Sequence, residues 1–189
     1  MTTVDTEIKP SNRSALTLLV PFAVGAAVSV ALGVYGRLHT ATLIAFTLPG
    51  FTSALTVKVW LASGAFLFAL VQLVSALAMW GKLPGVKRTP GWVSPLHRWS
   101  GRIAFLLVVP VAMMCLYALG FEHSSPRVLI HSLLGCFFFG AFSAKMLLLT
   151  YKDLPGWVIP VAGGALFSGL VGLWLTSALW FFTTVGFVF

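Results

Sequence analysis

Charged residues are scarce in this sequence. They make up 8% of the 189 residues, while 59% of the residues are hydrophobic. A soluble domain carries about 25% charged residues, so this chain has too few of them to cover a surface that faces water. The composition therefore predicts an integral membrane protein, with the lipid bilayer as its surroundings.

Acidic residues are the scarcest charged type, with four against twelve lysines and arginines and a net charge of +8. The four lie at or beyond the ends of the apolar segments: Asp5, Glu7, Glu122 and Asp153. Transport through a carboxylate relay needs acids within the spans, so this composition disfavours such a transporter. The basic residues form no stripe with interleaved aromatics, which excludes nucleic acid as a partner.

Cysteine is nearly absent as well. Cys115 and Cys136 lie in apolar runs, and neither belongs to a CxxC or CxxCH motif. This excludes a zinc ribbon, a thioredoxin-like site and covalent c-type haem attachment, and it is typical of cysteines that are simply buried. The sequence also lacks HExxH, GxSxG and a phosphate-binding loop, so no common hydrolytic or nucleotide site is predicted.

Long apolar runs dominate what is present. A helix needs about 20 apolar residues to cross a bilayer, and five segments qualify: 16–36, 59–81, 97–119, 127–151 and 157–184. Residues 38–57 are apolar too, but they are rich in threonine and interrupted by Pro49 and Gly50. We expect an outer loop there, partly helical. The sequence thus predicts an all-α membrane protein with a tail over 1–15 and a single transmembrane helical domain over 16–189.

The basic residues indicate the orientation of these spans. With five spans and the N-terminus inside, nine of the twelve lie on the cytoplasmic side. The other three are Arg37, Lys58 and Arg127. A sixth span over 38–57 would move the "GKLPGVKR" loop outside, against the positive-inside rule. We therefore predict an N-in, C-out, multi-pass protein of the inner (plasma) membrane, with residues 1–15 in the cytoplasm.

Two short patterns predict how the helices begin and pack. "PGWVSP" at 90–95 and "PGWVIP" at 155–160 each lead into a span that starts on the cytoplasmic side. Proline suits a first helical turn and tryptophan suits the membrane interface. Small residues four apart let helices approach closely in lipid. They occur in the first span and the last: Gly25, Ser29, Gly33, Gly164, Ser168 and Gly172.

The histidines are the candidate ligands. Of the four, His97 alone is predicted on the cytoplasmic side, and the others lie on the outer side: His39, His123 and His131. His131 shares a helical stripe with Gly135 and Lys145, and a stripe that carries ionisable groups is expected to face protein or water. Glycine one turn after His131 would leave room for a flat ring.

A haem bound at His131 would have several partners within reach. Arg127 lies one turn before His131 and is placed to meet a propionate. Candidates for the second axial ligand are His39, His123, Met113 and Met114, because they match His131 in depth or lie in outer segments. His97 cannot share this haem, since about 30 Å of hydrocarbon separates the two ends. Next to Arg98 and Trp99, His97 is interpreted as an interfacial anchor, with haem ligation as the alternative.

Three runs carry a family resemblance: "HRWSGRIAFLLVVPVA" at 97–112, "HSLLGCFFFGAFSAK" at 131–145 and "LPGWVIPVAGG" at 154–164. They resemble an uncharacterised family of small five-span bacterial membrane proteins, over most of the chain. The histidines at helix starts are also similar to those of cytochrome b561 and ferric-reductase-like four-helix bundles. Those bundles bind b-type haem between helices and transfer electrons.

This second resemblance implies a b561-like helical bundle in which His97 and His131 are positions of similar type. A two-haem b561 uses four histidines on four helices, in two pairs of matched depth. Here the spans 59–81 and 157–184 contain no histidine. The resemblance is therefore compatible with one haem and does not support two.

The sequence leaves three functions open. The first is a membrane electron-transfer protein with one b-type haem near the outer side, held by His131 with His39 or Met113 and by Arg127. The second is a haem-free anchor or accessory subunit of a redox or respiratory complex, with a quinone as a further ligand. The third is a small transporter. Any enzymatic role is expected to be that of an oxidoreductase component, and no catalytic residue is predicted.

Overall fold

The computed structural model describes residues 13–85 and 88–189, and the side chains from Leu18 onward within these ranges. The predicted tail over 1–15 lies outside the described residues, except for the three that begin the first helix. Lys87, one of the residues in the charge comparison, also lies outside them.

The described chain consists of helices joined by loops. The elements are α1 (Arg13–Leu38), α2 (Ala54–Met79), α3 (Val93–Met113), η1 (Met114–Leu119), α4 (Pro126–Leu148), α5 (Val158–Trp174), η2 (Leu175–Leu179) and α6 (Trp180–Thr184). The two η segments are π-helical and continue α3 and α5 without a break. Five helical stretches are long and apolar enough to cross a membrane. This confirms the predicted all-helical fold with five spans.

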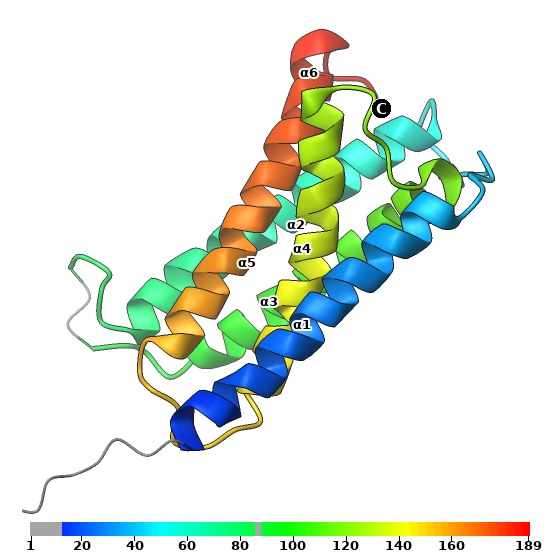
Figure 1. Cartoon of the computed structure of the whole chain (residues 1–189). Coiled ribbons are helices and arrows are strands. Elements are labelled where there is room, and N and C mark those ends of the chain that lie inside the picture. Colours follow the sequence, from blue (N-terminus) through cyan, green and yellow to red (C-terminus); the bar gives the residue numbers. More distant parts are fainter. Residues whose placement is uncertain (1–12, 86–87) are drawn as a thin grey trace, which may run out of the picture.

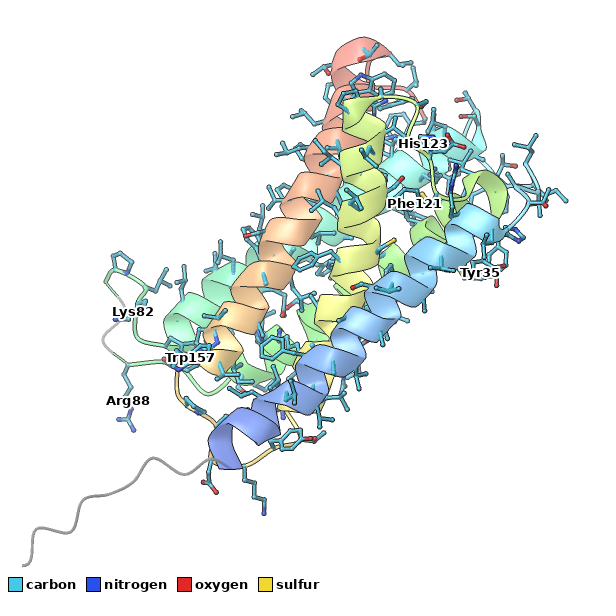
Figure 2. The ribbon with its side chains drawn as sticks, viewed as in Figure 1. Tyr35, Lys82, Arg88, Phe121, His123 and Trp157 are labelled. Atoms are coloured by element: carbon cyan, nitrogen blue, oxygen red, sulfur yellow. The ribbon has the colours of Figure 1, made fainter. Side chains whose placement is uncertain are left out.

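The helices form an elongated bundle (Figure 1). Helix α1 packs along α4, α2 packs along α3, and α4 packs along α5. We call the end where α1 and η1 finish and where α2 and α4 begin the outer end, after the predicted orientation. Lys82, Arg88 and Trp157 lie at the opposite, inner end, whereas Tyr35, Phe121 and His123 lie at the outer end (Figure 2).

Small residues bring α1 against α4. A Cβ added to Gly25 would lie 2.7 Å from the Gly140 carbonyl oxygen, and a Cβ added to Gly140 would overlap Ser29. This is the close approach that the small-residue face of the first span predicts. The matching face of the last span differs, because a Cβ at Gly164 would meet nothing within 4 Å, while one at Gly172 would lie 2.6 Å from Leu134.

The repeated PGWV sequence forms the same turn twice. Val93 N–H donates to the Pro90 carbonyl at 3.1 Å, and Val158 N–H donates to the Pro155 carbonyl at 3.0 Å. Both valines are buried, while the tryptophan before each of them caps its helix and is exposed. The two copies are therefore equivalent helix starts at the inner end, with their tryptophans where an interface would lie.

The apolar segment between the first two spans is largely not helical. Residues 39–53 form a loop, and α2 begins at Ala54, five residues earlier than the predicted span. Thr42 and Leu43 donate backbone N–H groups to the Tyr117 and Ala118 carbonyls at 3.0 and 3.2 Å. The loop is thus hydrogen-bonded to the end of η1, and its exposed apolar side chains include Leu43 and Ile44.

Side chains from four helices form the central core. Ala65 and Ala69 of α2 pack with Val108 of α3, Phe138 of α4 and Leu170 of α5. Small residues on α2 let the larger side chains of the other helices meet here. Val108 and Leu170 also line the space that opens on the outer side of this core.

Candidate functional site

A cavity of about 550 Å³ lies at the outer end of the bundle, between α2, η1, α4 and η2. This volume falls within the range of about 300–1,000 Å³ that is usual for ligand sites. The walls are mainly aliphatic and aromatic side chains. The few polar residues gather towards the outer end: Lys58, Glu122, Ser124, Arg127, His131, Ser132, Thr176 and Ser177. An apolar chamber with a small polar group at one end suits an amphiphilic ligand.

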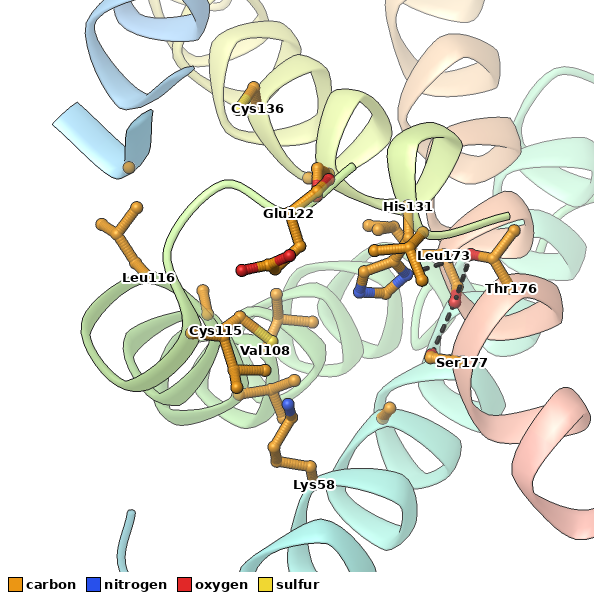
Figure 3. A pocket seen from close by; sticks show the side chains of 18 of the residues that line it. Lys58, Val108, Cys115, Leu116, Glu122, His131, Cys136, Leu173, Thr176 and Ser177 are labelled. Carbon is orange, nitrogen blue, oxygen red and sulfur yellow. Dashed lines mark hydrogen bonds between the residues drawn. The ribbon is translucent and has the colours of Figure 1, made fainter. Parts of the chain in front are cut away.

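His131 lies in the cavity wall, and a hydrogen bond holds the side of its ring that faces away from the cavity. Its Nδ1 is 3.0 Å from the Thr176 hydroxyl, and that hydroxyl lies 2.7 Å from the Gly172 carbonyl oxygen. A threonine hydroxyl has one hydrogen to donate, and the carbonyl takes it. The hydroxyl must then accept from the Nδ1–H of His131, so Nε2 carries the lone pair. Figure 3 shows this side of the ring facing into the cavity.

The π-helical segment η2 supplies this partner. Thr176 and Ser177 both belong to η2, and both line the cavity. A single π turn shifts the helical hydrogen-bond pattern and often occurs at functional sites. Within this turn, the Thr176 carbonyl accepts a hydrogen bond from the Arg127 guanidinium at 2.5 Å. One residue of η2, Thr176, therefore positions both Arg127 and His131 of α4.

Arg127 is held in two ways at the rim of the cavity. Besides its hydrogen bond to the Thr176 carbonyl, its guanidinium carbon lies 3.9 Å from the ring centroid of Trp180. A guanidinium has five N–H donors, so donors remain for a ligand after these contacts. The contact with the Trp180 ring helps to hold the planar guanidinium in one orientation.

Two further charged groups face the same space. Lys58 of α2 is partly buried, and its amine points towards the cavity, as does the Glu122 carboxylate (Figure 3). The loop that carries Glu122 is held by Ser132, whose hydroxyl donates to the Glu122 carbonyl at 2.8 Å. Phe121 N–H donates to the Gly36 carbonyl at 2.8 Å, which ties the loop to α1. The rim thus combines two cations with one anion.

Comparison with known proteins places the chain in a family. A family model described as a family of unknown function (DUF6529) matches residues 18–189. The chain belongs to this family. The matched part of this DUF6529 member includes the five spans and the residues that line the cavity. No curated protein and no solved structure matches the chain.

The structure brings together some of the predicted site residues of this DUF6529 chain. Arg127, His131 and Met113 all line the cavity, although Met113 is 47% exposed. Met114 is buried elsewhere, and His123 lies on the exposed part of the loop, so neither contributes to the cavity wall. Of the predicted second ligands, Met113 is the one that the fold places beside the same space as His131.

His39 lies outside the cavity. Its ring stacks on Tyr35 at a centroid distance of 5.0 Å and meets Tyr117 edge-on at 5.6 Å. Its Nδ1 is 3.4 Å from the Tyr35 hydroxyl, and its Nε2 is buried without a partner. The fold therefore places His39 in an aromatic group at the end of α1 and not opposite His131.

His97 joins α3 to α2. Its Nδ1 is 2.8 Å from the Ser75 hydroxyl, which lies 2.6 Å from the Val71 carbonyl oxygen. The Gln72 amide donates to the His97 carbonyl and, at 2.7 Å, to the Ser100 hydroxyl. These contacts make His97 part of a polar clamp between two spans, away from the cavity.

A metal ion bound by protein side chains alone is not supported within the part of the chain that the structure describes. No group of three or more histidine, cysteine, aspartate or glutamate residues there has a metal-binding arrangement.

Several residues of the site were not predicted as site residues from the sequence, and four of them matter for its chemistry. Cys115 lines the cavity although its sequence context predicted only burial, and Lys58 had been interpreted as a topology signal. Glu122 and Thr176 stand in no motif. Their roles depend on which helices meet, and a hydroxyl on the last span gives no sequence signal that it will accept a bond from a histidine on the fourth.

Proposed function

We propose that this chain is a membrane electron-transfer protein that binds one b-type haem in the outer cavity, with His131 as an axial ligand. The observation that carries the proposal is the Nε2 lone pair of His131, which faces an apolar cavity of about 550 Å³. Neutral imidazole nitrogen is a usual haem ligand. The resemblance of the sequence to cytochrome b561 and ferric-reductase-like bundles points to the same cofactor.

The residues around His131 fit a flat macrocycle. Gly135, one helical turn further into the membrane, lines the cavity, and a Cβ built on it would meet nothing within 4 Å. The space beside Gly135 is therefore open, which supports room for a flat ring one turn from His131. Apolar side chains from α3 and α5 form the deeper walls, including Val108 and Leu170.

The chain would hold and orient the haem and surround it with mainly apolar side chains. The haem would supply reversible one-electron chemistry. Thr176 accepts the Nδ1–H of His131, which fixes the ring and increases the basicity of Nε2. Met113 is the predicted second ligand that the cavity wall offers. Most of the cavity wall is apolar, and Arg127 at the rim would bind a propionate.

The proposal is tested by purifying the protein in mild detergent and recording a reduced-minus-oxidised spectrum with haem quantitation. We expect a b-type α-band at about one haem per chain. His131→Ala should abolish the band, while the matched variant His97→Ala should retain it. A protein that stays colourless when expressed with ample haem would overturn the proposal.

One observation favours a second candidate, a haem-free redox subunit that binds a quinol. Glu122 and His131 both point into the cavity (Figure 3), and both accept protons. A dihydroxy aromatic ring between them would find one acceptor for each hydroxyl group. Lipid extracts of the same preparation decide this candidate. The amount of quinone that co-purifies with the wild type should be lower in both Glu122→Gln and His131→Ala.

A further inference from the structure

The rim of the cavity has a positive character that the His131 site alone does not require. Lys58 of α2 and Arg127 of α4 both line the cavity near its outer end, where one acid, Glu122, faces the same space (Figure 3). Below this rim the walls are apolar down to the core around Phe138. The space is thus amphiphilic along its length.

The position of Arg127 in the first turn of its helix is one that helix stability does not favour. Arg127 is the second residue of α4, and Lys58 is the fifth residue of α2. The amino end of a helix carries a partial positive charge, which favours anions and disfavours cations. Neither helix has an acid in its first turn. Two cations therefore lie at one rim, where an anion would be stabilised by both.

We propose that Lys58 and Arg127 together bind the acidic end of an amphiphilic ligand, so that the ligand's apolar body extends into the cavity towards Phe138. Arg127 is preoriented by Trp180 and the Thr176 carbonyl and presents its remaining donors to an oxyanion. Lys58 adds a mobile point charge from the opposite helix. The version of this inference in which the ligand is haem rests on the proposed function, and the acidic end is then the pair of haem propionates.

Glu122 carries the opposite charge to Lys58 and Arg127, so the proposal predicts opposite changes in affinity when the acid and the cations are replaced. Its carboxylate repels an anionic ligand, so replacing it with the neutral isostere should increase affinity. Replacing either cation should decrease affinity, by about tenfold or more for a charge-assisted hydrogen bond. Misfolding cannot produce this pattern, because a damaged cavity would lose affinity in all three variants.

The test compares haem b with its dimethyl ester, in which both propionates are neutral. Chain freed of ligand and held in phosphatidylcholine nanodiscs is titrated with each porphyrin. We expect the wild type to bind the acid at least tenfold more tightly than the ester. Lys58→Gln and Arg127→Gln should bring this ratio towards one, Glu122→Gln should raise it, and the matched control Lys82→Gln at the inner end should leave it unchanged.

The possible outcomes separate this inference from the proposed function. Equal binding of acid and ester by the wild type overturns the inference and leaves haem binding intact. Binding of neither porphyrin overturns haem binding, and the inference is then decided with a lipid phosphate. Native mass spectrometry in phosphatidylglycerol should show lipid retained by the wild type and lost from Lys58→Gln. Equal retention by both would overturn it.

Discussion

At the scale of single residues, the tautomer of a neutral His131 ring follows from its contact with a hydroxyl on another helix. Thr176 gives its one hydrogen to the Gly172 carbonyl and so accepts from Nδ1–H, which leaves Nε2 for the cavity. His97 has the same arrangement with Ser75, whose hydroxyl is bonded to the Val71 carbonyl. The two histidines have similar orienting partners, and they differ because His131 lines the outer cavity and His97 does not.

Thr176→Val removes the hydrogen-bond acceptor while keeping the shape of the side chain. The Nδ1–H of His131 then loses its partner, and the ring is free to turn or to change tautomer. Loss of such an orienting contact typically costs about 10–100-fold in affinity at a metal ligand, and we expect a loss of this size in haem titrations. Thr183→Val is the matched control, because Thr183 bonds to the Leu179 carbonyl in the same way but lies outside the cavity. Unchanged affinity in Thr176→Val would show that the hydroxyl does not orient the ring.

The site could be predicted from the sequence only where its signal is local. His131 and Arg127 lie one turn apart on one helix, so their common face follows from helical spacing. Lys58 carries a charge that the sequence assigns to topology just as well. Thr176 had no signal at all, because its role arises from the packing of α5 against α4 and from a π turn that no motif marks.

At the scale of elements, the contact between α1 and α4 depends on glycine. We expect Gly25→Ala to destabilise the protein by about 1–3 kcal/mol, the usual effect of overpacking. The added Cβ would lie 2.7 Å from the Gly140 carbonyl oxygen and 2.9 Å from the Cβ of Ala144. Thermal unfolding in detergent measures the effect. Gly164→Ala is the control, because its Cβ would meet nothing within 4 Å. Equal behaviour of the two variants would contradict this account of the contact.

The clamp between α2 and α3 gives a second element-scale prediction. Ser75→Ala leaves the Nδ1–H of His97 without its acceptor. Hydrogen bonds between membrane helices contribute about 0.6 kcal/mol on average and about 1.7 at most, so we expect a loss of stability in this range. Haem affinity should not change, since Ser75 does not line the cavity.

Ser143→Ala is the matched control for this clamp. Its hydroxyl bonds to the Phe139 carbonyl on its own helix, at 2.9 Å, as Ser75 does to Val71. A denaturant series on both variants separates the bond between helices from the bond within one. If both variants lose the same stability, the contact with His97 contributes nothing.

Helix positions were predictable to within a few residues, and helix irregularities were not. Apolar length alone indicated the five spans, and the repeated PGWV sequence correctly predicted two helix starts. Pro110 lies inside α3 and shortly before η1, so a break in the helical hydrogen-bond pattern had one visible signal there. The segment η2 has no proline and no comparable signal. Both π segments border the cavity, which is where packing and function outweigh local preference.

At the scale of the whole molecule, the five spans place the cavity at one end of the bundle. The sequence predicts that this end faces outward, because an N-in arrangement with five spans puts nine of the twelve basic residues on the cytoplasmic side. Loop 39–53 lies at the same end as the cavity, and the loop between α2 and α3 lies at the other, with Lys82 and Arg88 (Figure 2).

Cysteine labelling in intact cells tests this orientation. Thr40→Cys should react with a membrane-impermeant maleimide from outside, because Thr40 is exposed on the outer loop. Lys82→Cys should react only after the cells are permeabilised. The wild type measures the background from its two native cysteines, which lie in spans. The reverse pattern would place Lys58, Arg127 and the mouth of the cavity in the cytoplasm. An acidic ligand would then have to enter from the cytoplasmic side, and any electron donor or acceptor at the rim would be a cytoplasmic one.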